Sequence, residues 1–278
     1  MKKILVPCDF SEPAMEAFQF AVDLASHSGG KVVVLKVIDL PISTYGASID
    51  MPLYTYSPSL LKDLEEDAKK NYKKMFAKFG NGSSNISFVV VHGPTSPMIR
   101  DYIAEKKIDL VIMGTHGTTG VSEFFVGSNT EKIVRYSKAP VLAIRKAIAV
   151  SSIKNIVFPT SLELNQTDFV KKLKSLQEFF DAKLHILYLN TPFNFIREVE
   201  LKEYAKHYKF TNCELYIRND RYEPDGIRSF VKEIKADMLA MSTHGRKGLS
   251  HLIYGSITED VVNHVECLIW TCGIKKTK

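Results

Sequence analysis

The sequence is poor in cysteine, and its few cysteines follow no recognisable pairing. The four in 278 residues form no CxxC pair and no metal-ligand spacing, so we expect reduced thiols and no structural zinc. No run of about 18 apolar residues occurs, which argues against a membrane span. The basic N-terminal residues lead into no hydrophobic signal-peptide region. These absences predict a cytoplasmic protein with no membrane partner. The cysteines are Cys8, Cys213, Cys267 and Cys272.

A strong excess of charge of one sign is also missing. There are 37 lysines and arginines against 31 aspartates and glutamates, and part of the net charge of +6 lies in the tail at 275–278. Much of the remainder is on stretches of mixed charge such as 62–70, which is typical of a solvated helix face. Neither a helix-turn-helix signature nor an RNP-type aromatic motif occurs, so the sequence does not favour nucleic-acid binding.

Short apolar runs alternate with helical patterns along the first half of the chain. Helices are predicted from Ser11, as N-cap, to the stop at Gly29-Gly30, and over 60–79 and 97–105. Strand, helix and strand at this spacing imply parallel strands joined by right-handed crossovers. The pattern predicts an α/β fold in which a doubly wound, five-stranded parallel sheet carries helices on both faces. The strands are predicted at 3–7, 31–38, 86–91, 110–113 and 140–145.

The same order of elements restarts after a linker at 147–152. Pro159 follows Pro7 by 152 residues, whereas Gly245 follows Gly117 by 128, so the second copy has lost 24 residues in between. The strand matches at 153–159, 183–189, 213–217 and 237–241 put the loss after its second strand. A repeat of this length predicts two tandem domains rather than a solenoid, and we expect them at 1–146 and 153–278.

A glycine-rich stretch, Gly114 to Ser128, follows the buried strand at 110–113. Glycines reach positive φ and let backbone N–H groups approach a ligand, so Gly114, Gly117 and Gly120 can form a nest for an anion. The helix that begins near Gly127-Ser128 would direct further N–H groups and its positive dipole end to the same point. Ordinary turn and cap glycines are the alternative, which the long interval ending in Gly-Ser disfavours.

The spacing Gly114-x2-Gly117-x9-Gly127-Ser128 resembles the nucleotide-binding pattern of the universal stress protein family. The resemblance covers nearly the whole chain, closely over 1–146 and more loosely over 153–274. It implies tandem HUP-like, adenine-nucleotide-binding domains, with ATP, ADP or AMP as ligand and Mg²⁺ as a companion of the nucleotide. It also implies that the two domains pack as a pseudo-dimer through their last strands, near 141–144 and 267–270. A further homodimer and unknown protein partners are left open.

The same resemblance assigns the residues of the nucleotide site. Asp9, at the end of the first strand, would bind the adenosine moiety, although capping the following helix is an alternative role. Val37 would contribute a backbone contact and Met113 would pack on the base. The loop at 39–59 is expected to close over the ligand. The site residues are Pro7, Asp9, Val37 and Met113 toward the adenosine, and Gly114, His116, Gly117, Gly127, Ser128, Asn129 and Thr130 toward the phosphates.

The second copy departs from this pattern at two positions. Ser161 stands at the place of Asp9 and removes the carboxylate, while Ser242 stands at the place of Gly114. The serine side chain disfavours positive φ there, at a cost on the order of 1 kcal/mol if the second copy needs the same backbone conformation. The sequence therefore predicts that the second copy is degenerate as a nucleotide site and that Gly255-Ser256 remains at most a weak anion site.

The sequence offers no dedicated catalytic group. It has no Walker A lysine, no pyrophosphatase-like Ser-Gly-Gly-x-Asp loop and no carboxylate cluster beside the glycine loop. A nucleotide-binding stress-response or signalling module is therefore favoured over an enzyme. The alternatives are a scaffold that binds proteins and no nucleotide, and a slow adenine-nucleotide hydrolase.

Overall fold

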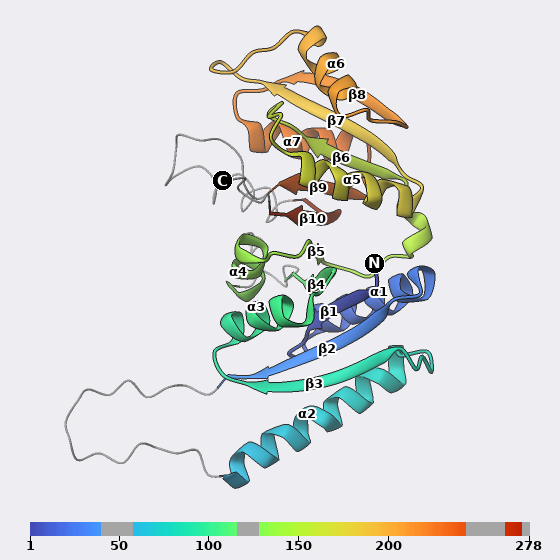
Figure 1. Ribbon diagram of the computed structural model, residues 1–278, viewed down its shortest axis with the longest axis vertical. Helices are drawn as coiled ribbons and strands as arrows, with labels where there is room; N and C mark the ends of the chain where they lie inside the picture. The colour runs from blue at the N-terminus through green and yellow to red at the C-terminus, as the bar shows by residue number, and fades with distance from the viewer. Residues whose placement is uncertain (40–57, 116–127, 243–264, 274–278) are drawn as a thin grey trace, which may run out of the picture.

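A computed structural model of the chain describes residues 1–39, 58–115, 128–242 and 265–273. Strands and helices alternate through both halves (Figure 1). The first half contains β1 (Lys3–Pro7), α1 (Glu12–Ser28), β2 (Lys31–Ile38), α2 (Pro58–Phe79), β3 (Ile86–His92), α3 (Thr95–Lys106), β4 (Leu110–Gly114), α4 (Ser128–Tyr136) and β5 (Val141–Ile144). The second half contains η1 (Val150–Ser152), β6 (Asn155–Pro159), α5 (Thr167–Phe180), β7 (Lys183–Asn190), α6 (Glu198–His207), β8 (Cys213–Asn219), α7 (Glu223–Glu233), β9 (Met238–Ser242) and β10 (Leu268–Cys272).

The ten strands of the described residues belong to one sheet, in the order β3-β2-β1-β4-β5-β10-β9-β6-β7-β8. Each half has the same internal order and parallel pairing, as predicted. The halves meet where β5 and β10 pair antiparallel, with Leu142 opposite Trp270 and Ala143 opposite Ile269. The expected pairing of the last strands is confirmed, and it merges the two five-stranded sheets into one.

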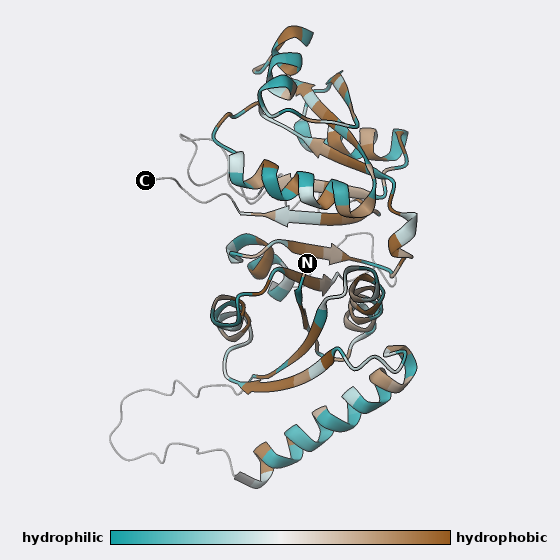
Figure 2. Cartoon of the chain, turned by 45° about the vertical axis from the view of Figure 1, so that its right-hand side comes forward, coloured by the Kyte–Doolittle hydropathy of each residue, from teal (hydrophilic) through white to brown (hydrophobic). Residues whose placement is uncertain are grey.

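Helices cover both faces of this sheet, and the hydrophobic side chains lie between the layers (Figures 1 and 2). One buried cluster runs across both halves beneath α1, α2, α5 and α6, and includes Leu142 and Trp270 at the junction. The opposite face is packed by α3 and α4 in the first half and by α7 in the second. Because strand side chains alternate between faces, Val34 joins the first cluster while its neighbour Leu35 joins the second.

Two equivalent aspartates show that the internal repeat extends to individual hydrogen bonds. Asp109 Oδ2 accepts the amides of Lys2 and Lys3 at 2.8 and 2.9 Å. Asp237 Oδ2 accepts the amides of Lys154 and Asn155 at 2.9 and 2.8 Å. Each aspartate precedes the fourth strand of its half and fixes the start of the first strand.

The segment between the halves is tied to α1. The amide of Ala147 donates to Glu16 Oε2 at 2.5 Å, and the amide of Val150 donates to Asp23 Oδ2 at 2.8 Å. Val150 is buried in the shared cluster. The predicted linker is therefore a docked connection in the described structure.

The first helix begins and ends close to the predicted residues. Gly29 adopts a left-handed conformation with φ of 63° and ends α1, a position that glycine occupies at little cost. Ser11 has the backbone position of an N-cap, but its side chain makes no capping bond to the helix. Its hydroxyl donates to Asp9 instead.

No helix in the described residues is both long and apolar enough to cross a membrane.

Replacing Trp270 by alanine should destabilise the whole chain. The indole is 2% exposed at the junction and packs 5.5 Å from the Phe169 ring, so truncation should lower the free energy of unfolding by about 3–5 kcal/mol. Urea unfolding followed by far-UV circular dichroism measures this, because Trp270 is the sole tryptophan. Phe193→Ala, at a side chain 98% exposed, is the matched control and should change stability by less than about 0.5 kcal/mol. A loss below about 1 kcal/mol in Trp270→Ala would contradict the shared core.

His185 should make the stability depend on pH. Its ring is buried on β7 between Tyr216 and Asn155, and burial lowers its pKa, with Glu214 acting in the opposite direction and Lys183 reinforcing the decrease. Below about pH 6.5 the unfolded chain binds a proton that the folded chain binds more weakly, so stability falls as the pH falls. Urea midpoints between pH 7.5 and 5.5 should fall less steeply in His185→Gln. His207→Gln, at an exposed histidine, should keep the wild-type slope.

Candidate functional site

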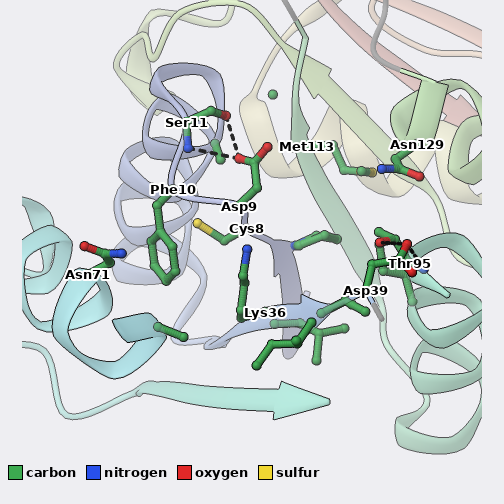
Figure 3. A pocket seen from close by; sticks show the side chains of 18 of the residues that line it. Cys8, Asp9, Phe10, Ser11, Lys36, Asp39, Asn71, Thr95, Met113 and Asn129 are labelled. Carbon is green, nitrogen blue, oxygen red and sulfur yellow. Dashed lines mark hydrogen bonds between the residues drawn. The ribbon is translucent and has the colours of Figure 1, made fainter. Parts of the chain in front are cut away.

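A cavity of about 610 Å³ opens at the carboxyl ends of β1, β2 and β4 (Figure 3). The chain leaves β1 toward β2 on one side, while β4 pairs with β1 on the other, so the strand order reverses here. Crevices at such a reversal are where open α/β sheets bind ligands. The volume suits one small-molecule ligand. Side chains from α2, α3 and α4 complete the described walls.

Asp9 follows β1 and lies on the wall of this cavity. Its Oδ1 accepts the Ser11 amide at 3.0 Å and the Ser11 hydroxyl at 2.6 Å. Oδ2 accepts no hydrogen bond from another described residue. The carboxylate is thus oriented by Ser11, the N-cap residue of α1, and not by an amide of the helix as the capping alternative expects, and it still presents an oxygen toward the cavity (Figure 3).

Asp9 is ionised at neutral pH. Partial burial opposes ionisation, but the hydrogen bonds from the Ser11 hydroxyl and amide, together with the positive charge of Lys36, outweigh it and lower the pKa. An ionised carboxylate is a strong acceptor for hydroxyl or amine groups of a ligand.

Gly114 ends β4 directly beneath the first turn of α1. A Cβ at this position would lie 2.1 Å from the Pro13 carbonyl oxygen and 2.3 Å from its carbon. Gly114 is absent from the described glycines with positive φ, which are Gly29, Gly82 and Gly93. The expectation that Gly114 needs a left-handed backbone is therefore wrong. The position requires glycine because backbone meets backbone there.

The other predicted adenosine residues surround the same space. Pro7, Val37 and Met113 all line the cavity, at the ends of β1, β2 and β4 respectively. Val37 lies in the parallel ladder opposite Val91 and belongs to the buried cluster that also includes Met113. The structure therefore brings these residues to the same cavity as Asp9.

Asn129 and Thr130 enter the cavity from the first turn of α4. Asn129 Oδ1 accepts the Ser96 hydroxyl at 2.9 Å, which ties α4 to α3. The buried Thr130 hydroxyl donates to the Gly114 carbonyl at 3.2 Å and so holds α4 against the end of β4. In this structure the Thr130 hydroxyl proton is therefore used in a hydrogen bond to the backbone. The first turn of α4 still lines the cavity.

Several predicted residues lie outside the described part of the chain. They are His116, Gly117 and Gly127, the Ser128 side chain, Gly245, Gly255 and Ser256, and the loop at 40–57. Their assigned roles stay predictions. Within the described ranges, no group of three or more histidine, cysteine, aspartate or glutamate side chains could hold a metal ion.

Several polar residues of the cavity were not predicted as site residues from the sequence. Lys36 interrupts the apolar run of β2, a signal that could have been noticed. Asp39 accepts the Thr95 amide at 3.2 Å and hydroxyl at 2.9 Å, and so joins the end of β2 to α3. Asp67 and Asn71 come from α2, and only the folded arrangement brings that helix to the strand ends.

The equivalent region of the second half is built differently. The amide of Thr160 donates to Leu187 at 2.9 Å, which matches the bond from Cys8 to Leu35 and fixes the correspondence. The loop after Thr160 is held by Tyr208, whose hydroxyl accepts the Gln166 amide at 3.1 Å and donates to the Glu163 carbonyl at 3.4 Å. The Tyr208 side chain therefore holds this loop through two hydrogen bonds of its hydroxyl.

Comparison with known proteins identifies the family. The model of the universal stress protein family matches residues 1–145 and 196–272. A universal stress protein of Methanocaldococcus jannaschii is 31% identical over 146 residues, which cover 52% of this chain and 82% of that protein. Another from Synechocystis is 25% identical over 98% of this chain and 99% of its own length.

A solved structure confirms the fold over the whole length. The crystal structure of a universal stress protein from Archaeoglobus fulgidus has a TM-score of 0.77 at 18% identity and covers 98% of both chains. The chain therefore belongs to the universal stress protein family, with the α/β fold that its sequence predicts.

Installing the second-half residue at Gly114 should disturb the first half. Gly114→Ser must displace the turn containing Pro13, so we expect a loss of about 1–3 kcal/mol in the free energy of unfolding. The reverse change in the other half, Ser242→Gly, should cost no more than about 1 kcal/mol, the usual effect of glycine in a strand. Urea denaturation of both variants measures the difference. Equal losses of stability in Gly114→Ser and Ser242→Gly would mean that the close approach of Pro13 does not exclude a side chain at position 114.

Proposed function

We propose that the N-terminal half binds ATP or a related adenine nucleotide in the cavity at the ends of β1, β2 and β4. The observation that carries the proposal is the position of Asp9, whose oriented carboxylate faces a nucleotide-sized cavity at the reversal of strand order. Membership of the universal stress protein family and the glycine spacing from Gly114 to Ser128 support the adenine nucleotide as ligand.

The charges of the described walls support one orientation of the ligand. Three carboxylates, Asp9, Asp39 and Asp67, line the walls at the ends of β1 and β2 and on α2, and Lys36 is the one cation beside them, so the net charge of these described walls is negative and disfavours a phosphate group. The start of α4, with Asn129 and Thr130, supplies the positive end of a helix on the other side of Asp9. We therefore assign the nucleoside to the β2 side and the phosphates to the α4 side, with Mg²⁺ entering bound to the nucleotide.

The second half, which we take as a separate domain from residue 153 onward, is proposed to serve packing. Ser161 replaces the carboxylate of Asp9, and Tyr208 supports the loop behind it. In this proposal the protein acts in the cytoplasm as a nucleotide-dependent stress-response or signalling module with one site per chain.

Calorimetric titration with ATP tests the site. Asp9→Ser should weaken ATP binding about tenfold or more, because a charge-assisted hydrogen bond is lost. Ser161→Ala, at the corresponding position of the second half, is the matched control and should leave the affinity unchanged. Nucleotide released by heat from the purified wild-type protein should be an adenine nucleotide.

Two results would redirect the assignment. Wild-type protein that gives no heat with ATP and no shift in melting temperature would favour the protein-binding scaffold. Steady phosphate release in the presence of Mg²⁺, abolished in Asp9→Ser, would make the protein a hydrolase. Equal weakening by Asp9→Ser and Ser161→Ala would contradict a single site in the first half.

A further inference from the structure

Lys36 is the only cationic side chain among the described residues that line the cavity. It stands on β2, a strand that is otherwise apolar between its first and last residues. Strand alternation places its side chain on the face covered by α1 and α2, because Val32 and Val34 belong to the cluster on that face. In Figure 3 its ammonium points up toward Cys8 and Asp9.

No described residue accepts a hydrogen bond from the Lys36 ammonium. Its Nζ lies 5.6 Å from the centroid of the Phe10 ring, and it makes no hydrogen bond or ion pair with another described residue. An ammonium has three donors, and one that is half-buried without an acceptor loses part of its hydration. A ligand that supplies an acceptor would recover this cost.

The strand order places Lys36 at the nucleoside end of the cavity. From β2 to the glycine stretch, the order is β2, β1 and β4, so Asp9 lies between Lys36 and Gly114. Moreover, α4 packs on the opposite face of the sheet from Lys36. With the phosphates at α4, the lysine faces the sugar or the base.

We propose that Lys36 and Asp9 form a donor and acceptor pair that recognises the ribose hydroxyls, with Lys36 selecting ligands that carry this diol over ligands that lack it. Each hydroxyl of a cis-diol both donates and accepts a hydrogen bond. One hydroxyl therefore donates to the Asp9 carboxylate while the adjacent one accepts from the Lys36 ammonium. This assignment rests on the proposed function and adds a specificity-determining residue to it.

The second half has lost both members of the pair. The matching strand registers, Pro7 with Leu35 and Pro159 with Leu187, make Tyr188 the counterpart of Lys36. Tyr188 is 3% exposed and donates to Asn194. Ser161 stands at the place of Asp9. The donor and the acceptor are thus present together in one half and absent together in the other.

Affinity measurements with a series of ligands test the pair in the full-length protein. The ligands are adenosine, AMP, ATP and 2′,3′-dideoxyadenosine, and the variants are Lys36→Met and Lys31→Met. Lys36→Met should weaken adenosine, AMP and ATP by a similar factor of about ten. It should change dideoxyadenosine affinity less than about twofold. Lys31→Met removes the same charge from the exposed far end of β2 and should change none of them.

The outcomes separate this inference from the function on which it rests. A loss that grows from adenosine to ATP would make Lys36 a phosphate contact, and an equal loss for dideoxyadenosine would make it a base contact; either overturns the pair. So would a Lys36→Met that behaves like Lys31→Met. Wild-type protein that binds none of the ligands overturns the nucleotide site itself. Thermal unfolding verifies each variant, and Lys36→Gln carries the test if Lys36→Met does not fold.

Discussion

The contact between Gly114 and Pro13 sets the geometry on which the first-half site depends. With no side chain at Gly114, the first turn of α1 lies directly on the end of β4. The short connection from β1 then holds Asp9 against Ser11 at the mouth of the cavity. Thr130 also binds Gly114, because its hydroxyl donates a hydrogen bond to the Gly114 carbonyl and so holds α4 against the end of β4. One close approach thus positions the carboxylate, the strand end and the helix start together.

The second half lacks that contact, and its first helix is displaced along the chain. Ser242 occupies the strand end, and α5 begins at Thr167, three residues later than a copy of α1 would begin. The residue equivalent to Pro13 is Asn165, which lies before the helix. The later start of α5 lengthens the loop between β6 and α5, and Tyr208 supports this loop through its hydroxyl. Ser242 is not among the described residues with positive φ, so this strand end does not require a left-handed backbone in the second half either.

The fold was predictable from local signals, whereas the site was predictable only in part. Apolar runs mark the strands and Gly29 marks the end of α1, because these signals depend on residues that are neighbours in the sequence. The offset between the repeats marks the two halves. Asp9 was found because it follows the first strand at the edge where parallel sheets bind ligands, whereas Val37 and Met113 were found through the resemblance to the universal stress protein family. Asp67 and Asn71 were missed because only the packing of α2 brings them to the strand ends, whereas Lys36 did leave a local signal in the interrupted apolar run of β2. For Gly114 the residue type was recognised but the reason was wrong, since a steric approach by Pro13 leaves no local signal.

The junction of β5 and β10 also supports the site, although it lies away from the cavity. Because the buried cluster under α1 and α5 is continuous through Leu142 and Trp270, the second half forms part of the core on which α1 rests. The connection at 147–152 adds two further bonds to α1, through Glu16 and Asp23. The helix that orients Asp9 is therefore held from both halves. A second copy without its carboxylate still has a structural role, since it completes the sheet and supports the helix that orients Asp9.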